Sequence, residues 1–182
     1  MRTRLIASVK SMPGIEEHTK NVFWLGNEDQ PNYVRETDES LYSLAVKAGE
    51  HPVETWIRYM LDSEGQTLFH SRFFNHDLEK VSEFLQSDWI LPGIGDAGAH
   101  VSQIMDSGWP SFMLSHWCRN NKLFTIQEAI RKLTSAQARV LGLSDRGILR
   151  PGARADANIV NLDKVAERQP KLVHDFPNNA PR

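Results

Sequence analysis

Apolar residues recur at helical spacing in two neighbouring stretches of the amino-terminal half. In the first, Ser40 is placed to cap a helix over residues 41–48, and Gly49 is placed to end it. In the second, Pro52 suits the first turn of a helix, and Gly65 lies beyond its end. The pattern therefore predicts two consecutive helices in this part of the chain.

Short apolar runs elsewhere predict strands. Residues 4–9, 67–74 and 89–95 are each rich in β-branched, aromatic or aliphatic side chains. Asn75 is placed to cap a helix between the last two runs. A strand, a helix and a strand within ~30 residues have the size of a βαβ unit, which predicts parallel strands and a right-handed crossover. Asp96 then falls at the carboxyl end of a strand, where the catalytic groups of such sheets gather.

The last third of the chain changes from helical to hairpin-like patterning. A capping-box sequence that starts at Thr125 opens one helix, and a second helix is expected from Ser135 to Gly142. A Pro-Gly turn at positions 151 and 152 then precedes a β-like segment at residues 157–162. The pattern predicts a helix pair followed by a change to β structure.

Composition and charge disfavour several classes of protein. The chain has 182 residues and a formal net charge of −2, without a basic stripe, so neither nucleic acid nor a membrane surface is favoured as a partner. No apolar run approaches the ~18 residues needed to span a bilayer, and we interpret the amino terminus as neither a signal peptide nor an anchor. Cys118 is the one cysteine, which excludes an internal disulfide and is compatible with a cytoplasmic location.

The sequence GIGDAGAH, residues 93–100, contains the sharpest candidate for chemistry. A carboxylate at the end of a buried strand, as expected for Asp96, is able to ligate a metal and to move protons, and the flanking glycines let a substrate approach closely. Glycine-aspartate pairs are also common in ordinary turns, so spacing alone leaves both interpretations open. His100 comes from the same loop and is a second candidate for contact with substrate or metal.

Other polar residues are weaker candidates. Lys10 and Arg72 lie near predicted strand ends, where each would bind an anionic group of a substrate or remain solvated. The remaining histidines form no ligand pair typical of zinc, and each is expected at the surface or in a hydrogen bond. Ser115 and His116 are adjacent on an expected helix and point to different faces, which argues against a nucleophile and its base.

Three motifs combine in the second half of the chain. They are GDAGAH, the helix pair EAIRKLTSAQARVLGL, and the return sequence that runs from Gly147 to Asp156 as G-x-L-x-x-G-x-x-A-D. Together these motifs resemble the carboxyl-terminal part of enzymes of the amidohydrolase superfamily. More narrowly, the chain resembles the D-aminoacylase or N-acyl-D-amino-acid deacylase group, most strongly over residues 88–164.

The resemblance implies an α/β fold, the last part of a (β/α)₈ TIM barrel that binds one or two divalent metals, usually zinc. Residues 1–146 would belong to the barrel, with an irregular insertion near residues 10–38. Residues 147–182 would begin the return into a small β-sandwich domain and end in an irregular tail. Asp96 matches the last-strand aspartate, a metal ligand that accepts a proton from the metal-bound water and passes it to the leaving amine. Asp156 matches a structural position.

These implications predict a metal-dependent amidohydrolase that deacylates N-acyl-D-amino acids. The family's other ligands, among them a His-x-His, are not found in the sequence, so we expect the chain alone to be inactive and to bind zinc weakly or not at all. Two alternatives stay open: a cyclic-amide hydrolase similar to hydantoinase or dihydroorotase, and a non-catalytic interaction module. Expected partners are an N-acyl amino acid and, for an exposed apolar face, either the missing amino-terminal barrel segment or a second copy.

Overall fold

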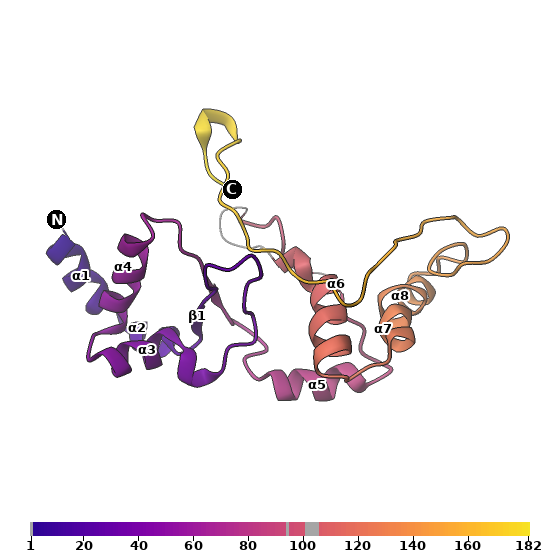
Figure 1. The fold of residues 1–182 in the computed structure, drawn as a ribbon, viewed down its shortest axis with the longest axis horizontal. Helices are drawn as coiled ribbons and strands as arrows, with labels where there is room; N and C mark the ends of the chain where they lie inside the picture. Colours follow the sequence, from indigo (N-terminus) through magenta and orange to yellow (C-terminus); the bar gives the residue numbers. More distant parts are fainter. Residues whose placement is uncertain (1, 94, 101–105) are drawn as a thin grey trace. The chain divides into compact units, whose positions relative to one another are not determined.

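The computed structural model describes residues 2–93, 95–100 and 106–182. The chain divides into two compact units (Figure 1). The first unit comprises Met1–Leu78 together with Gln169–Leu172, and the second comprises Glu79–Arg168 together with Val173–Arg182. No helix in the described ranges is long and apolar enough to cross a bilayer.

The first unit is mainly helical. Helix α3 packs against α4 and α2, and α1 packs against α4 (Figure 1). The bounds are α1 Arg2–Lys10, α2 Ile15–Thr19, the 3₁₀ helix η1 Thr37–Glu39, α3 Leu41–Ala48 and α4 Pro52–Asp62.

Local signals set the ends of α3 and α4, as the sequence predicts. The hydroxyl of Ser40 accepts a hydrogen bond from the Ser43 amide at 3.2 Å, and Gly49 ends α3 in the left-handed conformation at φ 67°. Pro52 occupies the first turn of α4. Both predicted helices are confirmed.

The sheet of the first unit has two short strands, β1 Val22–Trp24 and β2 Phe69–Ser71. They pair antiparallel, with Phe23 opposite His70. The core gathers where α3 lies against β1. Its buried apolar side chains are Val22, Phe23, Leu25, Leu41, Ala45 and Val53.

One strand prediction and one pairing prediction are wrong in this unit. Residues 4–9 lie within helix α1, which packs on α4; a short apolar run of this kind fits a helix as well as a strand. The run at 67–74 contains β2, but β2 pairs antiparallel with β1, which lies in the stretch expected to be irregular. The predicted parallel βαβ unit is therefore not formed by the described residues.

The second unit is built around helix η3, which continues directly from α6 and packs against α7, while α7 packs on α8. Helix η3 has the π-helical hydrogen-bond pattern over eight residues, a form that otherwise occurs mostly as single turns. The bounds are α5 Leu78–Gln86, η2 Asp106–Gly108, α6 Trp109–Phe112, η3 Met113–Asn120, α7 Ile126–Leu133, α8 Ser135–Val140 and η4 Pro177–Asn179.

The core of the second unit lies between η3, α7 and α8. Cys118 belongs to this core, and burial raises the pKa of its thiol. The helix pair predicted from Thr125 and Ser135 is confirmed, including the capping box between Thr125 and Glu128. The buried apolar side chains are Met113, Leu114, Trp117, Cys118, Phe124, Ala129, Ala136 and Ala138.

Three further predictions fail between residues 75 and 162. Asn75 does not cap α5, which begins at Leu78, because Asn75 itself is left-handed at φ 54° and an N-cap residue needs extended backbone. The described residues of 89–95 form no strand; Ile94 lies outside the described residues. Residues 157–162 also form no strand. Neither segment has a neighbouring strand in the described ranges to pair with.

Gly147 lies against the junction of α7 and α8. A Cβ placed on Gly147 would lie 2.9 Å from the backbone nitrogen of Ser135 and 2.9 Å from the carbonyl carbon of Thr134. Gly147 is also left-handed, at φ 76°. Only glycine satisfies both conditions, so the return sequence is fastened to the helix pair by a close backbone contact.

The second unit leaves many large apolar side chains uncovered. Trp89 is 97% exposed, and others of similar exposure lie on α8 and in the segments that follow it. The most exposed of these are Trp89, Val140, Leu141, Leu149 and Ile159. Large apolar side chains exposed in this way are available for burial by a partner.

Candidate functional site

Residues 95–100 form a glycine-rich turn in the second unit. The amide of Ala99 donates to the carbonyl oxygen of Asp96 at 2.9 Å, and Gly98 adopts φ 91° to close the turn. His100 follows in the left-handed region at φ 47°. The side chains of Asp96 and His100 are both exposed. The loop thus presents the two predicted residues at the surface, on a turn and not at a strand end.

The segment that leads into this loop is held by α7 and α8. The ammonium of Lys132 donates to the carbonyl oxygens of Ser87 at 2.8 Å and Ile90 at 3.3 Å. The side-chain amide of Gln137 donates to the carbonyl oxygen of Pro92 at 2.6 Å. The helix pair that the sequence predicts therefore touches the backbone of residues 87–92 through polar side chains.

A complete metal site is not formed by the residues that the structure describes. Among residues 2–93, 95–100 and 106–182, no three His, Cys, Asp or Glu side chains converge in a way that would hold a metal ion. Zinc sites need three or four such ligands. Asp96, the predicted ligand, lies in the second unit without a set of that kind.

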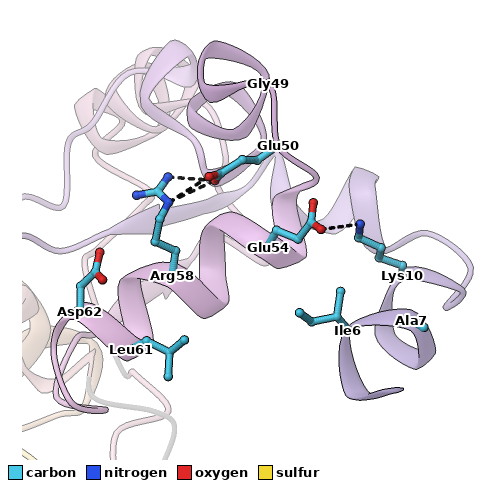
Figure 2. A pocket seen from close by; sticks show the side chains of 9 residues that line it. All are labelled: Ile6, Ala7, Lys10, Gly49, Glu50, Glu54, Arg58, Leu61 and Asp62. Carbon is cyan, nitrogen blue, oxygen red and sulfur yellow. Dashed lines mark hydrogen bonds and ion pairs between the residues drawn. The ribbon is translucent and has the colours of Figure 1, made fainter. Parts of the chain in front are cut away.

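Lys10 lies beside a cavity of about 850 Å³ between α1 and α4 in the first unit (Figure 2). Its ammonium pairs with the Glu54 carboxylate at 2.9 Å. Farther along α4, Arg58 pairs with Glu50 at 2.9 Å, and its hydrogen bonds hold the pKa of Glu50 below its usual range. Most of the charged side chains drawn in Figure 2 are thus matched by an opposite charge.

Arg72 follows β2 and binds backbone of its own unit. Its guanidinium donates to the carbonyl oxygens of Tyr33 at 3.0 Å and Arg35 at 2.8 Å, and lies 4.3 Å from the ring centroid of Phe23. These contacts fasten the loop after β1 to the sheet. Lys10 and Arg72 therefore make contacts with different partners, and both belong to the unit that does not contain Asp96 and His100.

The burial of His70 was not predicted from the sequence. The residue was expected at the surface or in a hydrogen bond, but its Nε2 is buried without a hydrogen-bond partner in the structure as described. Burial, with smaller contributions from Arg72 and Arg35, lowers its pKa from 6.5 to about 4. The alternation of side chains along a strand signals that His70 faces one side of β2, but the sequence does not reveal which side is covered.

The serine and histidine of η3 are not paired with each other. The Ser115 hydroxyl donates to the Glu167 carboxylate at 3.0 Å, which ties the chain that follows the return sequence to η3. The His116 ring stacks on Phe112 with centroids 4.7 Å apart, and burial lowers its pKa. This arrangement agrees with the prediction that the two residues point to different faces.

Asp156 pairs with Arg146 and Arg154, each at 3.1 Å. This geometry is consistent with the structural role that the resemblance implied for Asp156. The pairs lie near the surface, so they contribute little to stability individually.

Comparison with known proteins gives a family for this arrangement. Residues 39–175 match the model of a family described as the amidohydrolase family, a range that contains the Asp96 loop, both helices of the α7–α8 pair and the return sequence. The chain belongs to the amidohydrolase family.

One curated relative is an N-acyl-D-glutamate deacylase from Alcaligenes xylosoxydans xylosoxydans, 42% identical over 102 residues. The alignment covers 53% of this chain and 20% of the relative, so the chain spans about a fifth of that protein's length. The similarity supports the resemblance to the D-aminoacylase group that the motifs indicated. No solved structure matches the chain.

Proposed function

We propose that this chain provides the Asp96 segment of an enzyme that hydrolyses the amide bond of N-acyl-D-amino acids. The observation that carries the proposal is the position of Asp96, exposed on a glycine-rich turn inside the range matched by the amidohydrolase family. The printed name of the 42% identical relative supports the substrate class.

Asp96 is proposed to act as a proton shuttle. Its carboxylate would take a proton from the attacking water and then deliver it to the nitrogen of the leaving amine, so that one group acts first as base and then as acid. Exposure of Asp96 leaves it accessible to a substrate, and the small residues Gly95, Ala97 and Gly98 leave room around it. His100, at the end of the same turn, is proposed as a contact for the substrate.

Amidohydrolases are generally metal-dependent, and zinc is the metal that the resemblance implies. The described residues do not fit a complete metal site, since Asp96 has no matching set of ligands among them. We therefore propose that Asp96 is one ligand of a site whose other ligands lie outside the described residues. The proposed chemistry of this chain itself is limited to proton transfer at the Asp96 carboxylate.

The barrel is likewise a proposal for the whole enzyme. Family membership supports a (β/α)₈ barrel in which residues 1–146 contribute the last part and residues 147–182 begin the return to a second domain. The close packing of Gly147 on the α7–α8 junction is consistent with a change of direction there.

A second candidate function is association, and a separate observation favours it. The uncovered apolar side chains of the second unit, Trp89 and Leu149 among them, would be buried by a partner. We propose that the chain alone self-associates through this surface. Sedimentation at micromolar concentration should then show dimers or larger species, whereas a monomer at all concentrations would contradict association.

The deacylase proposal is tested by assaying the 182-residue chain beside a form extended at its amino terminus. Both are incubated with zinc and with N-acetyl-D-glutamate, N-acetyl-L-glutamate or dihydroorotate. We expect the extended form to release D-glutamate and the shorter chain to be inactive. Faster hydrolysis of dihydroorotate would support the cyclic-amide alternative instead.

The role of Asp96 is tested in the extended form by Asp96→Asn. This variant keeps the size of the side chain and removes its ability to carry a proton. We expect kcat to fall by about 10² to 10⁴, the usual contribution of general acid-base catalysis. A matched control is Asp88→Asn, since Asp88 is exposed and pairs with Arg131 outside the loop. Undiminished activity of Asp96→Asn would refute the proposal.

A further inference from the structure

We propose that Lys132 and Gln137 are positioning residues that fix the backbone leading into the Asp96 loop. Lys132 lies on α7 and Gln137 on α8, and together they donate hydrogen bonds to three carbonyl groups between residues 87 and 92. The last of these, on Pro92, is four residues before Asp96.

The burial of Lys132 distinguishes it from an ordinary surface lysine. The residue is only 3% exposed, although it carries an ammonium group on an otherwise amphipathic helix. An ammonium has three N–H donors, and burying it is costly unless partners are supplied. Two donors reach the carbonyls of Ser87 and Ile90, and the Phe124 ring lies 5.6 Å away. Two carbonyl groups and an aromatic ring thus compensate part of the cost of burying the ammonium.

The contact made by Gln137 fixes the chain where secondary structure does not. Residues 91–93 belong to no helix or strand, so their backbone has no regular ladder to restrain it. The Gln137 amide donates to the Pro92 carbonyl at 2.6 Å, a short hydrogen bond from a half-buried side chain. This bond and those of Lys132 therefore hold a segment in which Asp88, Trp89, Ile90 and Gly93 are exposed.

Arg131 offers a contrast within the same helix. Its guanidinium pairs with the side chain of Asp88 at 2.8 Å, and both groups are substantially exposed. It therefore touches the same segment without binding a carbonyl group. Exposed pairs of this kind restrain the backbone little, so Arg131→Met is a matched control for Lys132→Met.

The first experiment measures ¹⁵N relaxation of the 182-residue chain. The variants are Lys132→Met and Gln137→Leu, with Arg131→Met as the control and Gln137→Lys as a variant that keeps a donor of similar reach. We expect the order parameters of residues 95–100 to fall by about 0.2 in the first two variants, toward the range of flexible backbone. They should stay near the wild-type values in Arg131→Met and recover in Gln137→Lys.

Two outcomes would overturn the proposal. One is that the order parameters of residues 95–100 are unchanged in both Lys132→Met and Gln137→Leu. The other is equal loosening in Arg131→Met, which would mean that any contact with this segment has the same effect. If Lys132→Met does not fold, the comparison of Gln137→Leu with Gln137→Lys decides the result, because Gln137 carries no buried charge.

The second experiment tests whether the hydrogen bond of Gln137 to the Pro92 carbonyl affects catalysis, and it rests on the proposed function. In the amino-terminally extended form, Gln137→Leu should lower kcat by about tenfold, the effect of losing one well-placed hydrogen bond, and change KM by less than about twofold. A rise in KM with unchanged kcat would contradict a positioning role. If Asp96→Asn leaves kcat unchanged, the deacylase proposal fails, while the relaxation data still decide whether Lys132 and Gln137 fix the loop.

Discussion

The imidazole of His70 lies against the ring of Phe23, with the ring centroids 5.2 Å apart and the planes inclined by 23°. Tyr33 meets the same imidazole edge-on at 5.5 Å. Phe23 and His70 are opposite one another in the β1–β2 pair, so a titratable ring lies within the small sheet of the first unit. Its neutral form is favoured, because burial lowers the pKa of His70 to about 4.

This arrangement predicts a loss of stability in mild acid. In the unfolded chain the His70 pKa is near 6.5, so between pH 6.5 and pH 4 the unfolded state binds the proton and the folded state does not. The contribution is fully present above pH 6.5 and is lost as the pH falls, by up to about 3 kcal/mol. Urea unfolding at several pH values, monitored by tryptophan fluorescence, measures this loss.

His70→Phe isolates the effect, since phenylalanine keeps a stacked ring and does not titrate. As the pH falls from 6.5 to 4, the unfolding free energy of the wild type should decrease more than that of His70→Phe. A difference that is constant over this range would show that His70 titrates alike in the folded and unfolded chain.

Gly147→Ala should destabilise the second unit by more than about 2 kcal/mol, because the added Cβ would meet backbone atoms at 2.9 Å in a left-handed conformation. Gly142→Ala is the control: Gly142 is also left-handed, at φ 71°, but its Cβ would meet nothing within 4 Å. Gly142→Ala should cost about 1 kcal/mol. Thermal melts compare the two, and equal costs would show that the close contact relaxes freely.

Ser40→Ala should cost about 1 kcal/mol, because it removes the acceptor for the Ser43 amide at the start of α3. Ser82→Ala is a comparison change inside α5, where the half-buried Ser82 hydroxyl donates only to the Glu79 carbonyl one turn earlier; alanine has the better helix propensity, and no stability should be lost. The midpoint of urea unfolding distinguishes the two variants. A loss no larger for Ser40→Ala than for Ser82→Ala would contradict the capping role.

Arg72→Met should lower stability by about 2 kcal/mol, because two carbonyl groups lose a charged donor and Phe23 loses the guanidinium beside it. Arg72→Lys should restore only part of this loss, since a single ammonium does not reproduce the planar fork. The prediction separates a structural role from the substrate contact considered for Arg72. Unaltered urea midpoints in both variants would favour the substrate contact.

The helices that could be predicted from the sequence have signals within a few residues of each end. Ser40 and Gly49 bracket α3, and Thr125 with Glu128 opens α7 by reciprocal hydrogen bonds. These interactions are local, so the same residues that form them also identify them. The structure places both helices where the pattern does.

The strands were harder to predict because their partners are distant in sequence. The run at 67–74 was identified, but β1 is only three residues long and lies in a stretch without sustained periodicity. Residues 4–9 fit a strand or a helix equally well, and packing of α1 on α4 accompanies the helical outcome. Long-range pairing, which the pattern does not encode, decided these elements.

The candidate site was predictable only in part. Asp96 and His100 stand out by motif, whereas Lys132 looks like any lysine on an amphipathic helix. Its burial results from carbonyl groups more than 40 residues away, which no local pattern reveals. Sequence reasoning therefore found the group proposed to react, and the structure was needed to find what holds it.

Because Cys118 is buried, its reaction with a thiol reagent reports partial opening of the second unit. Because this is the one thiol in the sequence and it lies in the core between η3 and α7, a thiol reagent can reach it only when that core separates. The alkylation rate at constant pH then measures how often the second unit opens, with no signal from the first. Any ligand or partner of the Asp96 loop that stabilises this unit should slow the alkylation, without a label being added to the protein.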